Sequence, residues 1–207
     1  MIGLVIDTSS AHVTVSIVKG NSIVHEFKKE IDNDIASKIM SIINMELIES
    51  NIEIKDVEKL FVVNGPGSFT GVRIGVTIAK AIAWALNIKV VPISSLELMA
   101  TTPTTSKYLV PLIDARRGNV YAGIYDTELN AIVEDKLVSI NDILRYDNSE
   151  YTFVSNDEIK GINTIKPDTD ILKIVNKHMN DEGIIAHNLK PQYLKLTEAE
   201  ENRLKND

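Results

Sequence analysis

The chain contains no cysteine among its 207 residues. This absence excludes a disulfide framework, a thiol nucleophile and zinc sites built from cysteine. It fits a reducing compartment, and we expect a cytoplasmic protein. The opening stretch reaches an acid at Asp7, which is too early for a signal peptide. The apolar run after Gly71 is interrupted by Arg73 and Lys80 and is shorter than a membrane span needs, so no membrane partner is expected.

The sequence also lacks a run of lysine or arginine, and its formal net charge is −7. A broad basic face that binds RNA or DNA directly is therefore not expected, and contact with nucleic acid would come through a partner. The hydrophobic content of 44% is ordinary, and the chain is long enough for one large domain or two small ones.

Histidine is scarce and scattered. The four histidines form neither an H-x-x-x-H nor an H-E-x-x-H pair. No spacing indicates a Ser/His/Asp set. We therefore expect no metal site and assign no catalytic residue.

Hydrophobic periodicity in the first half of the chain predicts the order β-β-β-α-β-α-β-α. Asp34 is expected to cap the first long helix, and Ser94 or Ser95 the last short one. A meander followed by alternating helices and strands is typical of a mixed sheet covered by helices, and so of the α/β class. The predicted strands lie at residues 3–6, 12–19, 22–28, 60–64 and 89–93, and the helices at 35–50, 70–86 and about 95–99.

A polar segment, residues 101–107 with Pro103, is typical of a linker. We therefore predict two domains, at residues 1–103 and 104–207. The second begins with the strand 108–114 and gives weaker signals after Ile132. These weaker signals predict a short helix within 138–144 capped by Asn141 and a strand at 151–154. A helix is predicted at 169–180, and it either stays with its domain or packs back on the first domain. The charged tail after Leu196 is expected to fray.

The second unit begins like the first. When Asp7 is aligned with Asp114 without gaps, Val13 falls on Val120 and Ile17 on Ile124. Each site reads strand, Asp, short turn, strand. This echo indicates a structural duplication, although any two hairpins share some likeness.

The D-T-S-S turn after the first strand is a candidate phosphate or nucleotide loop. Thr8, Ser9 and Ser10 could donate to phosphate oxygens, and Asp7 could hold a magnesium-bound water. Alternatively, the acid and the hydroxyls satisfy the turn itself.

Two arginines occupy the equivalent turn of the second unit. Arg116 and Arg117 stand where the first turn has hydroxyls. Arginines can grip an anion or a partner carboxylate. The alternative is a solvated surface pair.

The stretch Asn64–Arg73 reads N-G-P-G-S-F-T-G-V-R. Gly65 and Gly67 permit positive φ angles, and Pro66 stiffens the turn. A helix N-terminus follows and offers free N–H groups to an anion. However, neither the P-loop pattern nor G-x-G-x-x-G is present, which makes phosphate binding here the weaker of the two interpretations.

The two long helices are apolar on nearly every side. On the helix 70–86, small residues recur every four positions from Gly71 to Ala83. A sheet covers only one side of such a helix, so a second chain in a helical bundle is expected to cover the rest, with packing inside the chain as the alternative. The predicted partner interface comprises Ile39, Met40, Ile43, Gly71, Val72, Gly75, Val76, Ala79, Ile82 and Ala83.

Five short motifs follow one another along most of the chain. They are I-D-T-S at 6–9, G-P-G-S-F-T-G-V-R-I-G at 65–75, S-S-L-E at 94–97, I-D-A-R-R-G at 113–118 and P-Q-Y-L-K at 191–195. The set resembles the bacterial TsaB (YeaZ) family in content and order, and the eleven-residue block is highly specific.

This resemblance implies an actin/hexokinase/Hsp70-like (ASKHA), ribonuclease H-like fold of two related subdomains, each with a mixed sheet and flanking helices. It implies a non-catalytic scaffold or activator that dimerises with the paralogue TsaD and supports transfer of threonylcarbamoyl to the adenosine next to the anticodon of tRNA. In that family the two long helices build a four-helix bundle with TsaD or with a second TsaB copy. The ATPase TsaE is a further partner, and tRNA is reached only through the complex. The resemblance implies no cofactor for this subunit and leaves ATP or ADP at the partner interface open.

One family feature is absent. Many members carry H-S-E at the start of the first helix, where this chain has Ile35, Ala36 and Ser37. The catalytic paralogue uses histidines on that helix for its metal, so their absence favours a non-catalytic role. The alternatives are a small ASKHA-fold kinase or ATPase, which Asp7 motivates, and a glycopeptidase, for which the sequence offers no metal site or nucleophile.

Overall fold

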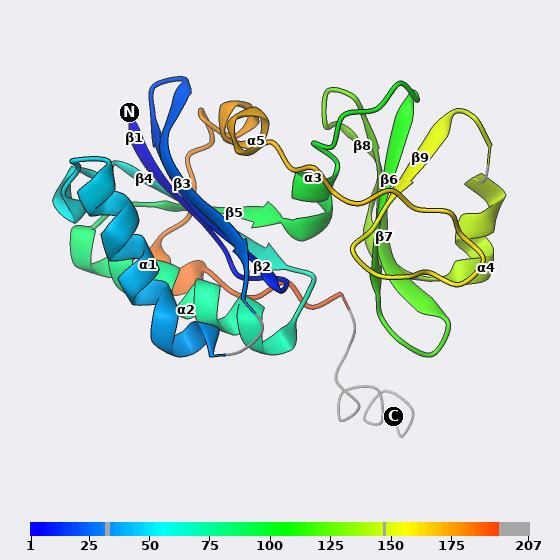
Figure 1. Ribbon diagram of the computed structural model, residues 1–207, viewed down its shortest axis with the longest axis horizontal. Coiled ribbons are helices and arrows are strands. Elements are labelled where there is room, and N and C mark those ends of the chain that lie inside the picture. The colour runs from blue at the N-terminus through cyan, green and yellow to red at the C-terminus, as the bar shows by residue number, and fades with distance from the viewer. Residues whose placement is uncertain (32–33, 147, 195–207) are drawn as a thin grey trace.

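Two β-sheets lie beside each other, each with its own helices (Figure 1). The computed structural model describes residues 1–31, 34–146 and 148–194. In the first sheet, of order β3-β2-β1-β4-β5, the first three strands in the chain are antiparallel and β4 and β5 continue parallel to β1. The second sheet has the order β8-β7-β6-β9, so both sheets are mixed and the predicted α/β class is confirmed. The strands are β1 (Ile2–Asp7), β2 (His12–Lys19), β3 (Ser22–Glu30), β4 (Lys59–Gly65), β5 (Val90–Ser94), β6 (Tyr108–Asp114), β7 (Asn119–Asp126), β8 (Ala131–Ser139) and β9 (Tyr151–Val154).

The helices divide between the two sheets (Figure 1). Two long helices, α1 and α2, lie side by side across one face of the first sheet, α3 lies between the sheets, and α4 belongs to the second unit. By length and composition α2 could cross a membrane, but core helices pass the same test, and one side of α2 lies in the core. The helices are α1 (Ile35–Glu49), α2 (Phe69–Leu86), α3 (Ser95–Met99), α4 (Ile140–Ile143) and α5 (Ile171–Lys177), with short 3-10 turns at Ile54–Asp56, Leu144–Tyr146 and Ala186–Asn188.

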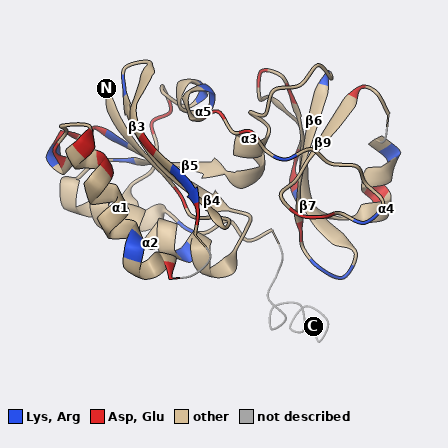
Figure 2. Cartoon of the chain, in the orientation of Figure 1, with Lys and Arg blue, Asp and Glu red and all other residues tan. Residues whose placement is uncertain are grey.

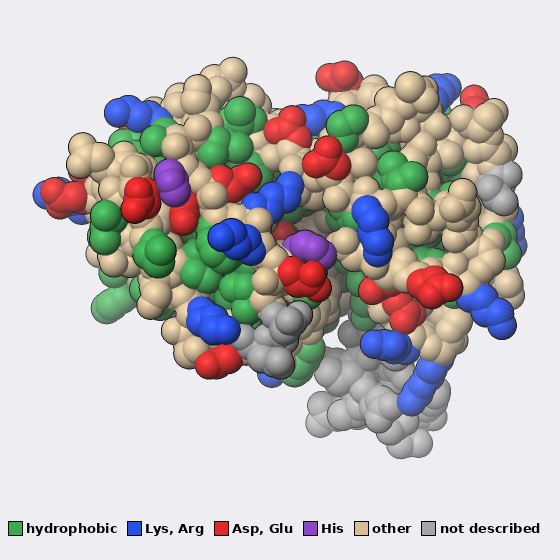
Figure 3. All heavy atoms as spheres, in the orientation of Figure 1, with side chains coloured by type: hydrophobic (Ala, Val, Ile, Leu, Met, Phe, Trp, Pro, Cys, Tyr) green, Lys and Arg blue, Asp and Glu red, His purple; other side chains and the backbone are tan. Residues whose placement is uncertain are grey.

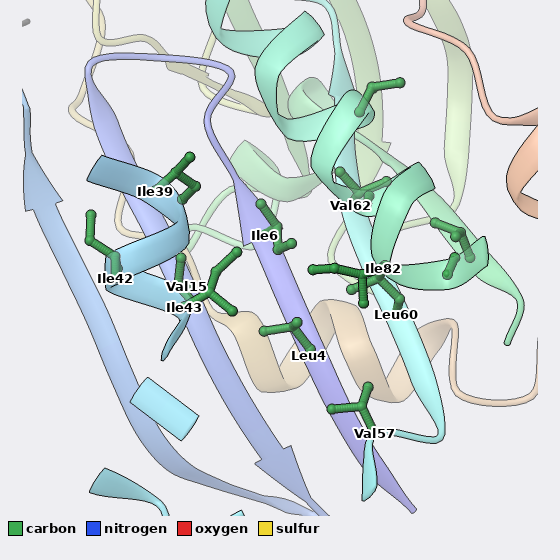
Figure 4. Packing of buried hydrophobic residues seen from close by; sticks show 14 of the residues in the cluster. Leu4, Ile6, Val15, Ile39, Ile42, Ile43, Val57, Leu60, Val62 and Ile82 are labelled. Atoms are coloured by element: carbon green, nitrogen blue, oxygen red, sulfur yellow. The ribbon is translucent and has the colours of Figure 1, made fainter. Parts of the chain in front are cut away.

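The main core lies between the first sheet and its two long helices. Figure 4 shows Ile39 and Ile43 of α1 directed at the strands, where Leu4 and Ile6 of β1 meet them. These four side chains are at most 2% exposed. Burying a side chain of this kind stabilises the fold by about 1.5–3 kcal/mol, so this layer fixes the two helices on the sheet.

A second core cluster lies between the two sheets. Val5 and Phe61 belong to it and alternate along their strands with residues of the first core, so they point to the opposite face of the first sheet. Tyr125 joins the cluster from the second sheet. The helices contribute six residues to this cluster, which are Leu96, Leu98, Met99, Ile171, Ile174 and Val175. The last helix, α5, therefore packs between the sheets and against the first unit.

The echo between the two units is only partly reproduced in space. Val13 and Ile17 lie on the helix-covered face of β2, as Val120 and Ile124 do on β7. In β1, Ile6 belongs to the main core, so the next residue, Asp7, points to the opposite face, between the sheets. In β6, Ile113 packs against the cluster between the sheets, so Asp114 points to the other face of the second sheet. The gap-free alignment is therefore wrong by one residue in the first strand, and the two acids are not equivalent.

Two residues of the predicted linker pack inside the fold. Thr101 and Thr102 are buried, and their hydroxyls accept the backbone N–H groups of Asp170 at 2.8 Å and Asp168 at 3.1 Å. The predicted linker does join α3 to β6 without regular secondary structure, and its first two residues hold the segment that leads into α5. The domain boundary at residue 103 stays a prediction.

Two of the predicted helix caps are wrong. Asp34 has a left-handed backbone (φ 64°) and its side chain accepts no helix N–H, accepting instead the Ser37 hydroxyl at 2.6 Å. Ser139, and not Asn141, caps α4, because the Asn141 N–H donates to its hydroxyl. The Ser94 cap is confirmed, since its hydroxyl accepts two N–H groups of α3.

One strand was missed by the sequence. The edge strand β8 carries exposed charged residues on its outer face and is irregularly paired, so its apolar signal is weak. The charged tail after Leu196 lies outside the described residues.

After α5 the chain returns to the first unit. Ile184 and Val90 exchange two backbone hydrogen bonds of 2.7 and 2.8 Å, which extend the edge of the first sheet. Leu189 is then buried in the core beneath α1 and α2. We call residues 184–194 the C-terminal strap, because they connect the end of the chain to the first sheet.

Candidate partner surface and interdomain crevice

The polar groups of the turn after β1 form hydrogen bonds within the turn and to the start of α2. The Asp7 carboxylate accepts the Ser9 N–H at 2.8 Å, and burial raises the pKa of this carboxyl above its ordinary value. The Thr8 hydroxyl donates to the Gly71 carbonyl at 2.7 Å, and the Ser10 hydroxyl donates to the His12 carbonyl at 3.2 Å. This pattern matches the alternative in which the hydroxyls satisfy the turn.

Three glycines press the start of α2 onto this turn. A Cβ atom on Gly67 would lie 2.3 Å from the Ser9 carbonyl oxygen, and one on Gly71 would lie 2.0 Å from the Thr8 carbonyl oxygen. A Cβ on Gly75 would lie 2.5 Å from the Thr8 hydroxyl. No side chain fits in these spaces, so these small residues serve packing inside the chain.

The C-terminal strap occupies the place where this fold class usually holds a ligand. In open α/β sheets that place is the crevice outside the carboxyl ends of the parallel strands. Here the Gln192 N–H donates to the Asn64 carbonyl at 2.7 Å, and the Asn64 amide donates to the Lys190 carbonyl at 3.1 Å. The hollow that remains beside Tyr121 measures about 120 Å³, which is small against the several hundred Å³ typical of sites for larger ligands.

The two predicted arginines lie on an exposed turn between β6 and β7. Arg116, Arg117 and Gly118 all have positive φ angles, of 67°, 55° and 77°. The Arg116 guanidinium is 3.5 Å from the Asp114 carboxylate and largely exposed. Both arginines are exposed to solvent.

The predicted partner interface is mostly inside the protein. Of its ten residues only Met40 is exposed, and the other nine are buried within the chain. The small-residue stripe of α2 faces the sheet and the Asp7 turn. These nine residues are therefore not available to a partner in this structure, because a smooth stripe serves an internal contact as well as an external one. Where a partner docks stays a prediction.

The outer sides of the same helices carry exposed apolar side chains, and of these the sequence analysis singled out Met40 alone. They are Met40, Met45 and Ile48 on α1, which are 53%, 59% and 65% exposed, and Trp84 on α2, which is 81% exposed. Figure 3 shows hydrophobic side chains gathered over the region of α1 and α2. We call these four residues the outer apolar surface. A signal for it existed in the sequence, since Trp84 lies on the side of α2 away from the glycines.

The described residues contain no group of three His, Asp or Glu placed to hold a metal ion. Two of the histidines instead form pairs with carboxylates. His25 contacts the buried Glu46 of α1, and His178 contacts Glu97 and Asp181. These contacts join elements of the fold.

Residues 94–97, the S-S-L-E motif, connect the two units. The Ser94 hydroxyl donates to Asp135 of β8, which also accepts the Tyr125 hydroxyl. Glu97 accepts Lys177 at 2.6 Å and His178 at 2.9 Å. The motif therefore ties α3 to the second sheet and to α5.

The family model and the relatives that match this chain are proteins of tRNA threonylcarbamoyladenosine biosynthesis. The family model described as "TsaD: tRNA N6-adenosine threonylcarbamoyltransferase" matches residues 30–184. The chain is 32% identical over 220 residues to the tRNA threonylcarbamoyladenosine biosynthesis protein TsaB of Bacillus subtilis (strain 168), covering 95% of each.

Two solved structures from Pseudomonas aeruginosa share the fold. YeaZ has a TM-score of 0.75 at 20% identity, covering 93% of this chain and 99% of YeaZ. A protein described as similar to peptidase YEAZ has a TM-score of 0.79 at 20% identity, covering 94% of this chain and 99% of its own. At this identity the likeness supports the fold alone.

Proposed function

The chain belongs to the TsaB family and serves the biosynthesis of threonylcarbamoyladenosine in tRNA, and from this premise we propose that it does so as a non-catalytic subunit that docks on a partner through the outer sides of α1 and α2. Its two mixed sheets with flanking helices form the ASKHA fold that the motifs imply. The proposed partner is TsaD, the threonylcarbamoyltransferase whose family model matches this chain. TsaE and tRNA would join through that complex.

The observation that carries this proposal is the outer apolar surface. Trp84 exposes 81% of its area, and Ile48 on the neighbouring helix exposes 65%. Large apolar side chains gathered on adjacent helices are typical of a protein interface, because covering them removes apolar area from water. A second copy of the chain is the competing occupant of the same surface.

The proposed absence of catalysis has separate support. The Thr8 hydroxyl donates to the Gly71 carbonyl of α2, the Ser10 hydroxyl donates inside the turn, and the strap crosses the crevice at Asn64. These contacts disfavour the kinase or ATPase alternative for the isolated chain. ATP or ADP at the interface with a partner, and a cytoplasmic location, belong to the same proposal.

Two substitutions test the partner surface. Trp84→Asp and Ile48→Asp place charges on the outer apolar surface, while Ile132→Asp, on the exposed outer face of β8, is the matched control. We expect the first two to weaken binding of TsaD in titration calorimetry by about 2 kcal/mol or more, the level of an interface hot spot, and to lower tRNA modification in a reconstituted reaction. The control should bind as the unchanged chain does.

If Trp84→Asp and Ile48→Asp bound TsaD as tightly as the unchanged chain and the control do, this surface would be refuted.

Titration of ATP and magnesium into the chain alone is a second experiment. Tight binding with turnover there would favour the enzyme alternative over the scaffold.

A further inference from the structure

An arginine on α2 is held between two aromatic rings. The Arg73 guanidinium lies 3.7 Å from the centre of the Phe69 ring, and its Nε donates to the Tyr193 hydroxyl at 2.7 Å. The rings of Phe69 and Tyr193 are 5.9 Å apart. A guanidinium stacked on an aromatic ring and fixed at Nε has lost most of its freedom before any ligand arrives.

The outer end of this guanidinium remains available. Within residues 1–31, 34–146 and 148–194, only its Nε forms a hydrogen bond to the protein. Phe69 is 57% exposed and Tyr193 is 49% exposed, so the rings flank the charge without covering it. An Arg with two aromatic neighbours has the composition of an interface hot spot.

Arg73 shares one side of α2 with the outer apolar surface. At 100° per residue, Arg73 and Trp84 lie within about 20° of each other around the helix, and eleven residues of 1.5 Å rise separate them by about 16 Å. Thr77 and Ala81 lie between them and are exposed. A partner helix that runs along α2 and covers Trp84 would therefore also pass over Arg73.

We propose that Arg73 is an anchor for an Asp or Glu carboxylate of the partner chain that docks on α1 and α2. This inference rests on the proposed function and names the chemistry that the partner must supply. The planar guanidinium matches a carboxylate in a two-bond fork, and preorganisation reduces the entropy lost on binding. Tyr193 is a positioning residue, because it sets the direction of the guanidinium through Nε.

A protein carboxylate fits this position better than an RNA phosphate. RNA binding needs several cations together, whereas the neighbouring Lys80 already donates to the carbonyls of His187 and Leu189. Figure 2 shows lysines and arginines spread over both units. The residues one turn from Arg73 on α2 are apolar or neutral, as expected at a protein interface; they are Phe69, Thr70, Val76 and Thr77.

The test measures TsaD binding to full-length variants by calorimetry and by association kinetics at several salt concentrations. Arg73→Ala should weaken binding about 10- to 100-fold, and Arg73→Lys should fall between, because an ammonium cannot form the fork. The association rate of the unchanged chain should fall more steeply with salt than that of Arg73→Ala. The matched control is Arg145→Ala, which removes an exposed arginine of the second unit.

Tyr193→Phe keeps the ring and removes the hydrogen bond to Nε. We expect about a threefold loss of affinity. The loss should vanish when Arg73 is already Ala, because Tyr193 acts through it. An equal loss in both backgrounds would show that Tyr193 does not position Arg73.

The outcomes separate this inference from the proposed function. Unchanged binding by Arg73→Ala together with lost binding by Trp84→Asp would overturn the anchor and leave the partner surface intact. Unchanged binding by both would overturn both. A third arm replaces Glu198, Glu200 and Glu201 of the tail with Gln. If the Arg73→Ala effect disappears in that chain, the carboxylate is the chain's own and the anchor proposal is wrong.

Discussion

Single glycines decide how closely the first strand and the second helix approach. The carbonyl groups of Thr8 and Ser9 occupy the positions where side chains of Gly71 and Gly67 would begin. The Thr8 hydroxyl then reaches the Gly71 carbonyl, so the contact is both tight and hydrogen-bonded. The glycine-rich block therefore serves this contact, and not only the turn that contains it.

Gly71→Ala tests this contact. Alanine favours a helix over glycine by about 1 kcal/mol, so the change would stabilise α2 if the space were open. We expect a loss of about 1–3 kcal/mol in the free energy of unfolding instead, because the added methyl meets the Thr8 carbonyl. Denaturant titration measures it. Thr77→Ala, on the exposed side of α2, is the control, and a stabilised Gly71→Ala variant would contradict the packing.

At the scale of elements, α1 and α2 each present two apolar sides with different uses. The inner side of α2 joins the main core, while its outer side carries Trp84 and Arg73. The sequence predicted both helices and their excess of apolar residues. It could not assign the sides, because a four-residue stripe from Gly71 to Ala83 suits a partner helix and the chain's own strand turn equally. Only the position of the Asp7 turn in space resolves this.

Trp84 is the single tryptophan of the chain, which makes it a reporter for the outer side of α2. With 5-fluorotryptophan incorporated, the chain should give one fluorine NMR resonance in its water-exposed position. We expect that resonance to shift when TsaD is added, because covering the ring changes its surroundings. Dilution of the chain alone tests the homodimer in the same way. A resonance that stays unchanged at saturating TsaD would place the interface elsewhere.

At the scale of the whole molecule, a polar cluster holds three parts together. Glu97 of α3 accepts Lys177 and His178 at the end of α5, and Lys177 also donates to the Leu129 carbonyl of the second unit. Burial alone would raise the pKa of Glu97 and lower that of His178. Burial is the largest single effect on each group, but the charged partners together outweigh it. His178 and Lys177 hold the Glu97 pKa below its ordinary value, and Glu97 and Asp181 hold the His178 pKa above its own.

His178→Gln should therefore destabilise the protein in a pH-dependent way. A raised histidine pKa adds stability that is complete below the unfolded value of about 6.5 and is lost as the pH rises through the folded value. We expect a loss of about 1.5–3 kcal/mol at pH 6, from a hydrogen bond to a charged group, and a smaller loss at pH 9. Unfolding titrations at the two pH values measure this. His187→Gln, on an exposed side chain, is the control, and an equal loss at both pH values would contradict the ion pair.

The sequence predicted the order of most elements and the family, because the apolar periods and the long motif are local signals. It left open where the last helix packs, since no local pattern links Ile174 to Phe61, more than 100 positions earlier. It also misplaced Asp114, because a gap-free alignment cannot show which face of a strand a residue takes. The strap was missed for the same reason, as its partners Asn64 and Val90 lie far back in the chain.

The C-terminal strap also constrains how the protein is made. The edge of the first sheet needs Ile184, and the core under α1 and α2 needs Leu189. A ribosome synthesises these residues only after the strands of the second unit, so the edge of the first sheet and the core under α1 and α2 stay incomplete until then. The first unit to be synthesised is therefore completed only after the second has been made, and a chain stalled or cleaved before Ile184 would expose apolar area for chaperones to bind.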